Sequence, residues 1–125
     1  MKTARFPRTV VAAIRDGKIL GIRAGTKPHR VIGIWAVVVE GRVFVRSWTL
    51  SKDGWYHAFL EDPRGTIQVG DREIRVRARR ATGERLRDKV EAAYAEKYDT
   101  KASQKYVRGF RTPRRRDTTI EFVPR

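Results

Sequence analysis

The sequence contains no cysteine and only two histidines, His29 and His57, among its 125 residues. The lack of cysteine excludes disulfide bonds and thiolate metal ligands. A zinc site built on two histidines would need carboxylates to complete its coordination, so we assign no metal ligands. No apolar run is long enough to cross a membrane, and residues 1–8 contain no hydrophobic signal core. These absences predict a cytoplasmic protein without membrane contact.

Acidic residues are scarce as well. The chain has 14 Asp and Glu against 29 Lys and Arg, which gives a formal net charge of +15 and an isoelectric point near 11.2. Such a charge indicates an anionic partner, which could be nucleic acid, a phosphorylated cofactor, another anionic small molecule or an acidic surface. The basic residues are spread along most of the chain, however, so an arginine-rich composition without functional meaning stays open as the alternative.

The composition is otherwise that of a folded protein. Hydrophobic residues make up 40% of the chain and aromatic residues 10%, so a chain of this length can bury a core. No internal repeat and no linker divides it, and we predict a single domain over residues 1–125.

The central feature is a stretch of β-branched and aromatic residues over residues 33–48. Two such runs, separated by Glu40-Gly41, predict a β-hairpin with a two-residue turn. The turn sets the cross-strand register, because residues equally distant from it face each other. The predicted pairs are Val39 with Arg42, Val37 with Phe44, Trp35 with Arg46, and Ile34 with Ser47.

The hairpin carries apolar side chains on both faces, because side chains alternate along a strand. One face is aliphatic and consists of Ile34, Ala36, Val38, Val43 and Val45. The other face is aromatic with one arginine and consists of Trp35, Val37, Val39, Phe44, Arg46 and Trp48. The aliphatic face fits the narrow inside of a small barrel. The aromatic face must then be covered by a helix, a partner subunit or a flat ligand.

The remaining patterns predict a mixture of helices and strands. Helices are expected at residues 9–17 with Thr9 as N-cap, at 55–60, and at 82–98 with Thr82 as N-cap. Further strands are expected at 18–23, at 66–78 as a second hairpin around Gly70-Asp71, and at 118–123, whereas the basic segment 105–116 is typical of turns. Together these predict a mainly β, α+β fold: a split antiparallel β-barrel of about six strands with one long and one or two short helices packed outside.

Several motifs resemble those of one bacterial family. They are Ile34-Trp35-Ala36-Val37, residues 43–48, Gly54-Trp55-Tyr56, residues 93–98, and the late Thr118-Thr119 with Pro124. Their order is similar to that in domain-of-unknown-function family 2255, which in turn resembles split β-barrels that bind FMN or deazaflavin. Those barrels include pyridoxamine-phosphate-oxidase-like proteins and deazaflavin-dependent nitroreductases. The resemblance implies a homodimer with FMN or deazaflavin between its subunits, against the outside of the barrel, and an oxidoreductase-like activity.

Candidate residues for the phosphate of such a cofactor lie at the end of the second hairpin strand. Arg46 and Ser47, followed by Lys52, can form charge-assisted hydrogen bonds with a phosphate. Ser47 points away from Arg46 along a regular strand, so it joins the site only if the strand ends or bulges there. We expect the preceding loop, with His29 and Arg30, to close over the phosphate.

Candidate residues for the flat ring are Trp48 and Trp55. Two structural alternatives stay open: Arg46 stacks on Trp35 as a cation–π pair, and the aromatic residues belong to the core or to a dimer contact. No catalytic residue is assigned, because a flavin ring itself carries the redox step.

Three functions remain open for this chain. The first is a flavin (FMN) or deazaflavin-binding, oxidoreductase-like split barrel, and the second is a cofactor-free relative that binds another anionic small molecule or a protein. The third is a nucleic-acid-binding protein whose phosphate contacts come from Arg114-Arg115-Arg116 and from the row Arg75, Arg77 and Arg79, which is otherwise a solvated sheet face. A homodimer is also expected, since Trp35, Phe44 and Trp48 share one face and such patches are seldom exposed.

Overall fold

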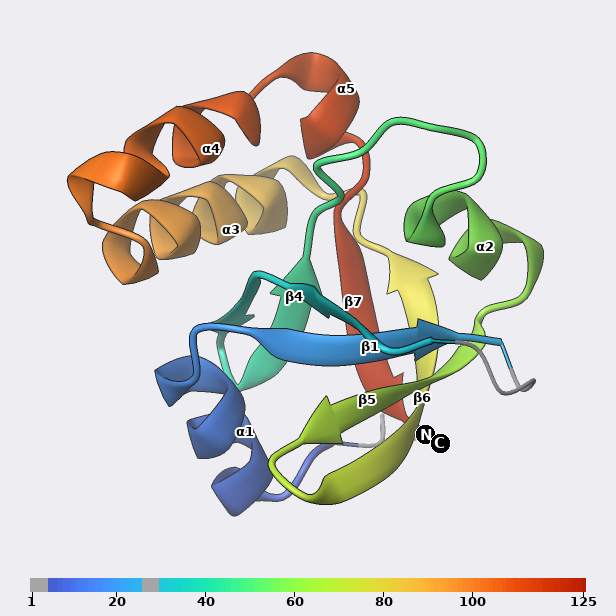
Figure 1. The fold of residues 1–125 in the computed structure, drawn as a ribbon. Helices are drawn as coiled ribbons and strands as arrows, with labels where there is room; N and C mark the ends of the chain where they lie inside the picture. The colour runs from blue at the N-terminus through green and yellow to red at the C-terminus, as the bar shows by residue number, and fades with distance from the viewer. Residues whose placement is uncertain (1–4, 26–29) are drawn as a thin grey trace.

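The computed structural model describes residues 5–25 and 30–125, and this part of the chain contains one seven-stranded antiparallel sheet (Figure 1). The sheet forms a nearly closed barrel with helices outside, so the expected mainly β, split-barrel fold is confirmed. The strand order is β2-β1-β5-β6-β7-β4-β3. The strands are β1 (Leu20–Ala24), β2 (Ile32–Ile34), β3 (Ala36–Val39), β4 (Arg42–Val45), β5 (Arg64–Val69), β6 (Arg72–Arg80) and β7 (Ile120–Pro124).

The barrel is closed by one continuous stretch of chain. The two edge strands of the sheet, β2 and β3, follow each other in sequence with only Trp35 between them. Strand β2 pairs with β1 at one edge, and β3 pairs with β4 at the other. The two edges therefore meet at Trp35, and this junction holds the sheet in its curled form.

The predicted pairing of the central hairpin is confirmed from the turn to Ala36 and is wrong beyond Trp35. Val39 pairs with Arg42 and Val37 with Phe44, as the turn predicts. Both turn residues, Glu40 and Gly41, have positive φ values of 54° and 74°, which is the backbone of a tight two-residue hairpin turn. Ile34, however, pairs with Leu20 of β1 rather than with Ser47.

A tyrosine hydroxyl takes the place of the expected pair between Trp35 and Arg46. The backbone N–H of Arg46 donates to the Tyr94 hydroxyl at 3.0 Å, and this hydroxyl donates to the backbone oxygen of Trp35 at 2.8 Å. The inserted oxygen separates the two strands at the point where β3 becomes β2. Burial raises the pKa of Tyr94, so its hydroxyl remains a donor at neutral pH.

The described residues form five α-helices and one 3-10 turn around the barrel. They are α1 (Arg8–Asp16), α2 (Trp55–Glu61), α3 (Glu84–Lys97), the 3-10 turn η1 (Lys101–Ser103), α4 (Gln104–Gly109) and α5 (Pro113–Arg116). Among the described residues, none of these helices has the length and apolar character needed to span a bilayer.

The helix positions bring three corrections. Helix α1 begins after Pro7 and α3 after Gly83, so neither Thr9 nor Thr82 is an N-cap. The basic segment 105–116 is helical rather than turn-like. It forms α4, which buries Val107, and α5, which begins with proline at its first turn. Proline suits that position because its fixed φ fits a helix and its missing N–H is not needed there.

The inside of the barrel is filled by aliphatic side chains, as the hairpin pattern predicts. Five of them are completely buried: Ile22, Val43, Val45, Ile67 and Val76. Helices α1 and α2 add residues to the same core, including Val10, Ile14 and Phe59. A ring of Phe59 lies so close to Gly65 on β5 that a Cβ there would approach it to 2.5 Å.

The aromatic face of the hairpin is covered by helices α3 and α4 of the same chain. Val37 and Phe44 pack with Val90, Tyr94, Tyr98, Val107 and Phe110 in a second core outside the barrel. Figure 1 shows α3 and α4 lying together beside β4. The sequence left a helix, a partner subunit or a flat ligand as the cover of this face. In the structure helices cover it, and Phe44 is fully buried beneath them.

Candidate functional site

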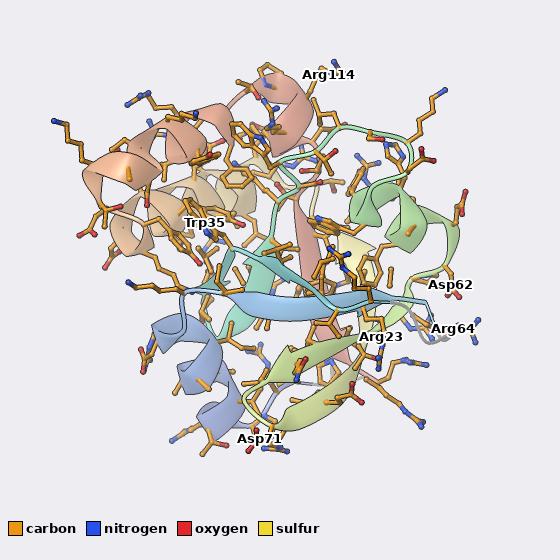
Figure 2. All side chains as sticks on the ribbon, viewed as in Figure 1. Arg23, Trp35, Asp62, Arg64, Asp71 and Arg114 are labelled. Carbon is orange, nitrogen blue, oxygen red and sulfur yellow. The ribbon has the colours of Figure 1, made fainter. Side chains whose placement is uncertain are left out.

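A hollow of about 550 Å³, which we call the aromatic groove, opens between the barrel and α4. Its base is the junction at Trp35, which lies between the helical layer and the strands in Figure 2. Helix α4 supplies one wall and Trp55 of α2 contributes to the other. The lining residues are Ile32, Gly33, Ile34, Trp35, Arg46, Trp48, Thr49, Trp55, Tyr106 and Phe110.

The rings of the aromatic groove hold one another in place. Trp35 stacks on Tyr98 with centroids 4.1 Å apart and planes 5° from parallel. Tyr106 meets Trp48 edge-on at 4.9 Å, and Trp48 meets Phe110 edge-on at 5.7 Å. Trp48 and Tyr106 nevertheless remain 38% and 37% exposed. The groove therefore presents accessible aromatic surface in a fixed arrangement, which is what a flat ligand requires.

Arg46 lines the inner end of the groove, but its guanidinium is bound to the protein. The residue is 1% exposed. Its Nε donates to Thr119 Oγ1 at 2.8 Å, and its Nη1 donates to the Phe110 carbonyl at 3.0 Å and to Glu91 at 3.2 Å. Burial lowers the pKa of Arg46, and Glu91 opposes this effect. The anionic partner that a buried arginine needs is thus Glu91, and among the described contacts no stacking on Trp35 is formed.

Ser47 is also bound within the protein, whereas Lys52 is exposed. Strand β4 ends at Val45, and Ser47 is fully buried in the connection to α2. Its backbone N–H donates to Thr118 Oγ1 at 2.9 Å, and its hydroxyl donates to the Thr49 carbonyl at 2.7 Å. Lys52 is exposed in the turn that follows. Of the three, only Lys52 has a side chain in contact with solvent.

A second hollow, which we call the polar hollow, adjoins the aromatic groove and shares Ile32 and Trp55 with it. Its volume is about 640 Å³, and its lining includes Arg30, Asp53, Glu61, Asp62 and Arg64. The structure therefore brings Trp48, Trp55 and Arg30 around two connected hollows. His29 lies outside the described residues.

The cations of the polar hollow differ in their partners. Arg64 donates to both carboxylate oxygens of Asp62 at 3.0 Å, and the two side chains lie together in Figure 2. These hydrogen bonds lower the pKa of Asp62 to about 2. Arg30, in contrast, is exposed and forms no ion pair within the described part of the chain. It is the cation of this hollow that is available to an anionic ligand.

Sequence reasoning missed the contribution of the C-terminal helices to the groove. Tyr106 of α4 and Phe110, which directly follows α4, line it, and the guanidinium of Arg115 lies 4.0 Å from the ring centre of Trp48. Arg115 also donates to the Trp48 carbonyl at 2.8 Å. A usable signal was present, since Val107 and Phe110 are three residues apart and Thr112-Pro113 is typical of a helix start.

Ion pairs fix α5 on α3 and so fix Arg115 beside the groove. Arg116 donates to Glu84 at 2.8 Å, to Asp88 at 2.9 Å, and to Glu91. These hydrogen bonds raise the pKa of Arg116, and the hydrogen bond with Glu91 has the largest effect. Glu91 thus binds both Arg46 and Arg116 and joins the barrel to the two helices.

The arginine row on β6 is a solvated face, as expected, because Arg75, Arg77 and Arg79 are all exposed. Arg79 differs from the other two in forming an ion pair with buried Glu121 on β7, which also binds Arg42. Burial raises the pKa of Glu121, but the hydrogen bonds from both arginines outweigh this effect and the pKa lies below its ordinary value.

These features define a split β-barrel protein with an aromatic groove outside the barrel, and solved structures share the fold. A conserved hypothetical protein of Mycobacterium tuberculosis has a TM-score of 0.59 at 12% identity, with 98% of this chain and 81% of that chain covered. A "putative pyridoxamine 5′-phosphate oxidase" of Listeria innocua has a TM-score of 0.61 at 12% identity, with 93% of this chain and 90% of that chain covered. An FAD-binding protein of Mesorhizobium loti has a TM-score of 0.54 at 10% identity, with 98% of this chain and 91% of that chain covered.

The sequence itself identifies the family. Residues 9–122 match the model of DUF2255, described as an uncharacterized protein conserved in bacteria. The chain belongs to this family, as its motifs indicate. A search of curated proteins finds no match.

Proposed function

We propose that this protein binds a flavin, FMN or a deazaflavin, in the aromatic groove and acts as a flavin-dependent, oxidoreductase-like protein. The observation that carries the proposal is the set of fixed, partly exposed rings around a hollow of about 550 Å³. Two proteins of the same fold support it, one of which is described as FAD-binding and the other as a "putative pyridoxamine 5′-phosphate oxidase".

The residues present fit such a ligand. A flavin joins a flat, largely apolar ring system to a polar chain that ends in phosphate. The aromatic groove offers apolar walls to the ring, while the adjoining polar hollow offers Arg30 to the phosphate. The two volumes, about 550 and 640 Å³, lie in the range of ordinary cofactor sites.

Each part of the site has a separate role in this proposal. Trp48 and Trp55 contact the ring and exclude water, and Arg115 holds Trp48 in position. Arg30, together with Lys52 from the neighbouring connection, neutralises the phosphate. Arg46 and Ser47 act indirectly as positioning residues, because they fix the Phe110 and Thr49 carbonyls at the groove. When bound, the flavin supplies the redox chemistry, and the protein supplies orientation and electrostatics.

The test compares FMN with riboflavin, which has the same ring but no phosphate. Quenching of tryptophan and flavin fluorescence should give a tighter Kd for FMN, with a deazaflavin titrated in parallel. Replacing Arg30 with Ala should weaken FMN binding about tenfold, the low end for a charge-assisted hydrogen bond, and leave riboflavin unchanged. Arg72→Ala is the matched control, because it removes another exposed arginine, from the β5–β6 hairpin.

The outcomes separate the two parts of the proposal. Equal affinity of the unmodified protein for FMN and riboflavin would refute the phosphate site at Arg30. Absence of binding for every flavin and deazaflavin would refute the proposal as a whole and favour the cofactor-free alternative. A Trp55→Ala variant should weaken both ligands, since it removes a ring contact that they share.

We also propose that the protein forms a homodimer through the outer surface of β1 and β2. Ile19 and Val31, which directly precede these two strands, are 59% and 37% exposed, and Ile19 covers Gly33 at the edge of the aromatic groove. A second copy on this surface would bury apolar side chains and shield the groove from water. Light scattering should give twice the chain mass of 14.5 kDa. Ile19→Glu should give the mass of a monomer. A monomer mass for the unmodified protein at micromolar concentration would refute the dimer.

A further inference from the structure

Helices α4 and α5 form a strongly basic surface that the flavin proposal does not explain. The sequence between residues 100 and 116 contains seven Lys and Arg and no acidic residue. Six of these cations form what we call the α4–α5 basic face: Lys101, Lys105, Arg108, Arg111, Arg114 and Arg115. The two helices lie together along one end of the molecule, and Figure 2 labels Arg114 at that end.

The cations of this face are not neutralised by the protein. The three carboxylates on α3 that face this region, Glu84, Asp88 and Glu91, all bind Arg116, the seventh cation of the segment. Arg108, Arg111 and Arg114 are exposed and form no ion pair within the described part of the chain. The next acidic residue, Asp117, pairs with Arg80 and Arg87. The outer side of α4 and α5 therefore carries an uncompensated positive charge.

Two exposed rings lie within this positive surface. Trp48 and Tyr106 are 38% and 37% exposed. The Arg115 guanidinium lies 4.0 Å from the Trp48 ring centre, and the Lys105 ammonium lies 5.2 Å from that of Tyr106. Each ring that could stack on a base thus has a cation lying over it, and this cation could contact the phosphate next to that base. Proteins that bind single strands without sequence preference combine these two elements.

We propose that the α4–α5 basic face binds single-stranded nucleic acid, with the backbone along Arg108, Arg111 and Arg114 and bases against Tyr106 and Trp48. A single strand fits better than a duplex, because its bases are free to stack on side chains. The assignment also revises the residues expected from the sequence. Arg116 and Arg79 are bound by carboxylates, so they do not contribute.

The experiment measures fluorescence anisotropy of labelled oligothymidine and oligouridine about 12 nucleotides long, within the site sizes of such surfaces. Affinity is recorded from about 0.05 to 0.3 M salt. The test variant is Arg108→Ala/Arg111→Ala/Arg114→Ala, and the matched control is Arg72→Ala/Arg75→Ala/Arg77→Ala. Both remove three exposed arginines and lower the net charge of +15 by the same amount.

The two triple variants should behave differently. Loss of three phosphate contacts should reduce the slope of log K against log salt by about 2 and weaken binding about 100-fold at 0.1 M salt. The control should stay within about twofold of the unmodified protein. Tyr106→Ala should weaken binding about fivefold or more, whereas Tyr106→Phe should not, because stacking requires the ring alone. If the test triple fails to fold, its three single substitutions should each cost about fivefold.

Several results would overturn the proposal. Equal loss in both triple variants would show that net charge alone drives binding, and undetectable binding at about 0.05 M salt would show that there is none. Equal affinity for duplex DNA or heparin would show that the rings do not take part. Flavin binding is measured separately in the same variants and should be unchanged in the test triple, so the failure of one proposal is distinguishable from the failure of the other.

Discussion

The hydroxyl of Tyr94 offers the sharpest test of how the barrel is closed, because a Tyr94→Phe variant removes one oxygen and leaves the ring. The residue is 1% exposed, and its hydroxyl bridges the Arg46 N–H at 3.0 Å and the Trp35 carbonyl at 2.8 Å. Without it, two buried backbone groups lose their partner. Each such group costs about 1–3 kcal/mol, so we expect the free energy of unfolding to fall by about 3 kcal/mol.

Urea denaturation followed by tryptophan fluorescence measures this loss. With a slope of about 1.5 kcal/mol per molar urea, the midpoint should fall by about 2 M, and Tm should fall by roughly 10 °C. Tyr56→Phe is the matched control, because its hydroxyl makes only a long contact of 3.4 Å to the Asp117 carbonyl. We expect that variant to lose less than about 1 kcal/mol.

The reasoning fails if Tyr94→Phe and Tyr56→Phe are equally stable. That result would mean that Trp35 and Arg46 pair directly once the hydroxyl is gone, so that the hydroxyl is not required to keep the two hairpin strands apart at the junction. Amide hydrogen exchange at Arg46 distinguishes the two cases. Faster exchange in Tyr94→Phe indicates an unpaired N–H, and unchanged exchange indicates a new ladder bond.

Three further predictions follow from packing and charge. Gly65→Ser should lower the free energy of unfolding by about 1–3 kcal/mol, because a Cβ there would meet Phe59 at 2.5 Å. Gly83→Ser, at an N-cap with open space, should be neutral or stabilising in the same denaturation assay. Because the pKa of Glu121 is lowered on folding, the stability that this residue contributes is present above its unfolded value near 4.5 and is lost as pH falls below that value. Glu121→Gln should therefore flatten the dependence of unfolding free energy on pH between about pH 5 and 3. Arg46→Met should lower the free energy of unfolding by about 3 kcal/mol, because the Phe110 and Arg87 carbonyls lose their donor. The ratio of FMN affinity to riboflavin affinity should not change in this variant. A changed ratio would indicate that Arg46 is a phosphate ligand after all.

Local patterns in the sequence predicted much of the fold. The Glu40-Gly41 turn determined the β3–β4 register, because a two-residue turn leaves one way to pair the strands that follow it. The alternation of side chains separated an aliphatic barrel face from an aromatic face. Helical periodicity placed α2 and α3: α2 begins at the expected Trp55, whereas α3 begins two residues later than expected, with Gly83 rather than Thr82 as N-cap. These features depend on residues that are close in sequence, and a single chain shows them directly.

The residues of the candidate site depended on contacts between distant parts of the chain. The sequence predicted that Arg46 needs a partner, but only the tertiary structure decided that the partner is Glu91, 45 residues away, rather than a phosphate. The sequence also predicted that the aromatic face is covered, and only the fold decided that α3 and α4 cover it. The physical reason is that burial and charge show what a side chain needs, whereas long-range packing determines which of several suitable partners reaches it. The same packing places Tyr94 at the junction of β2 and β3 and leaves the groove open beside it.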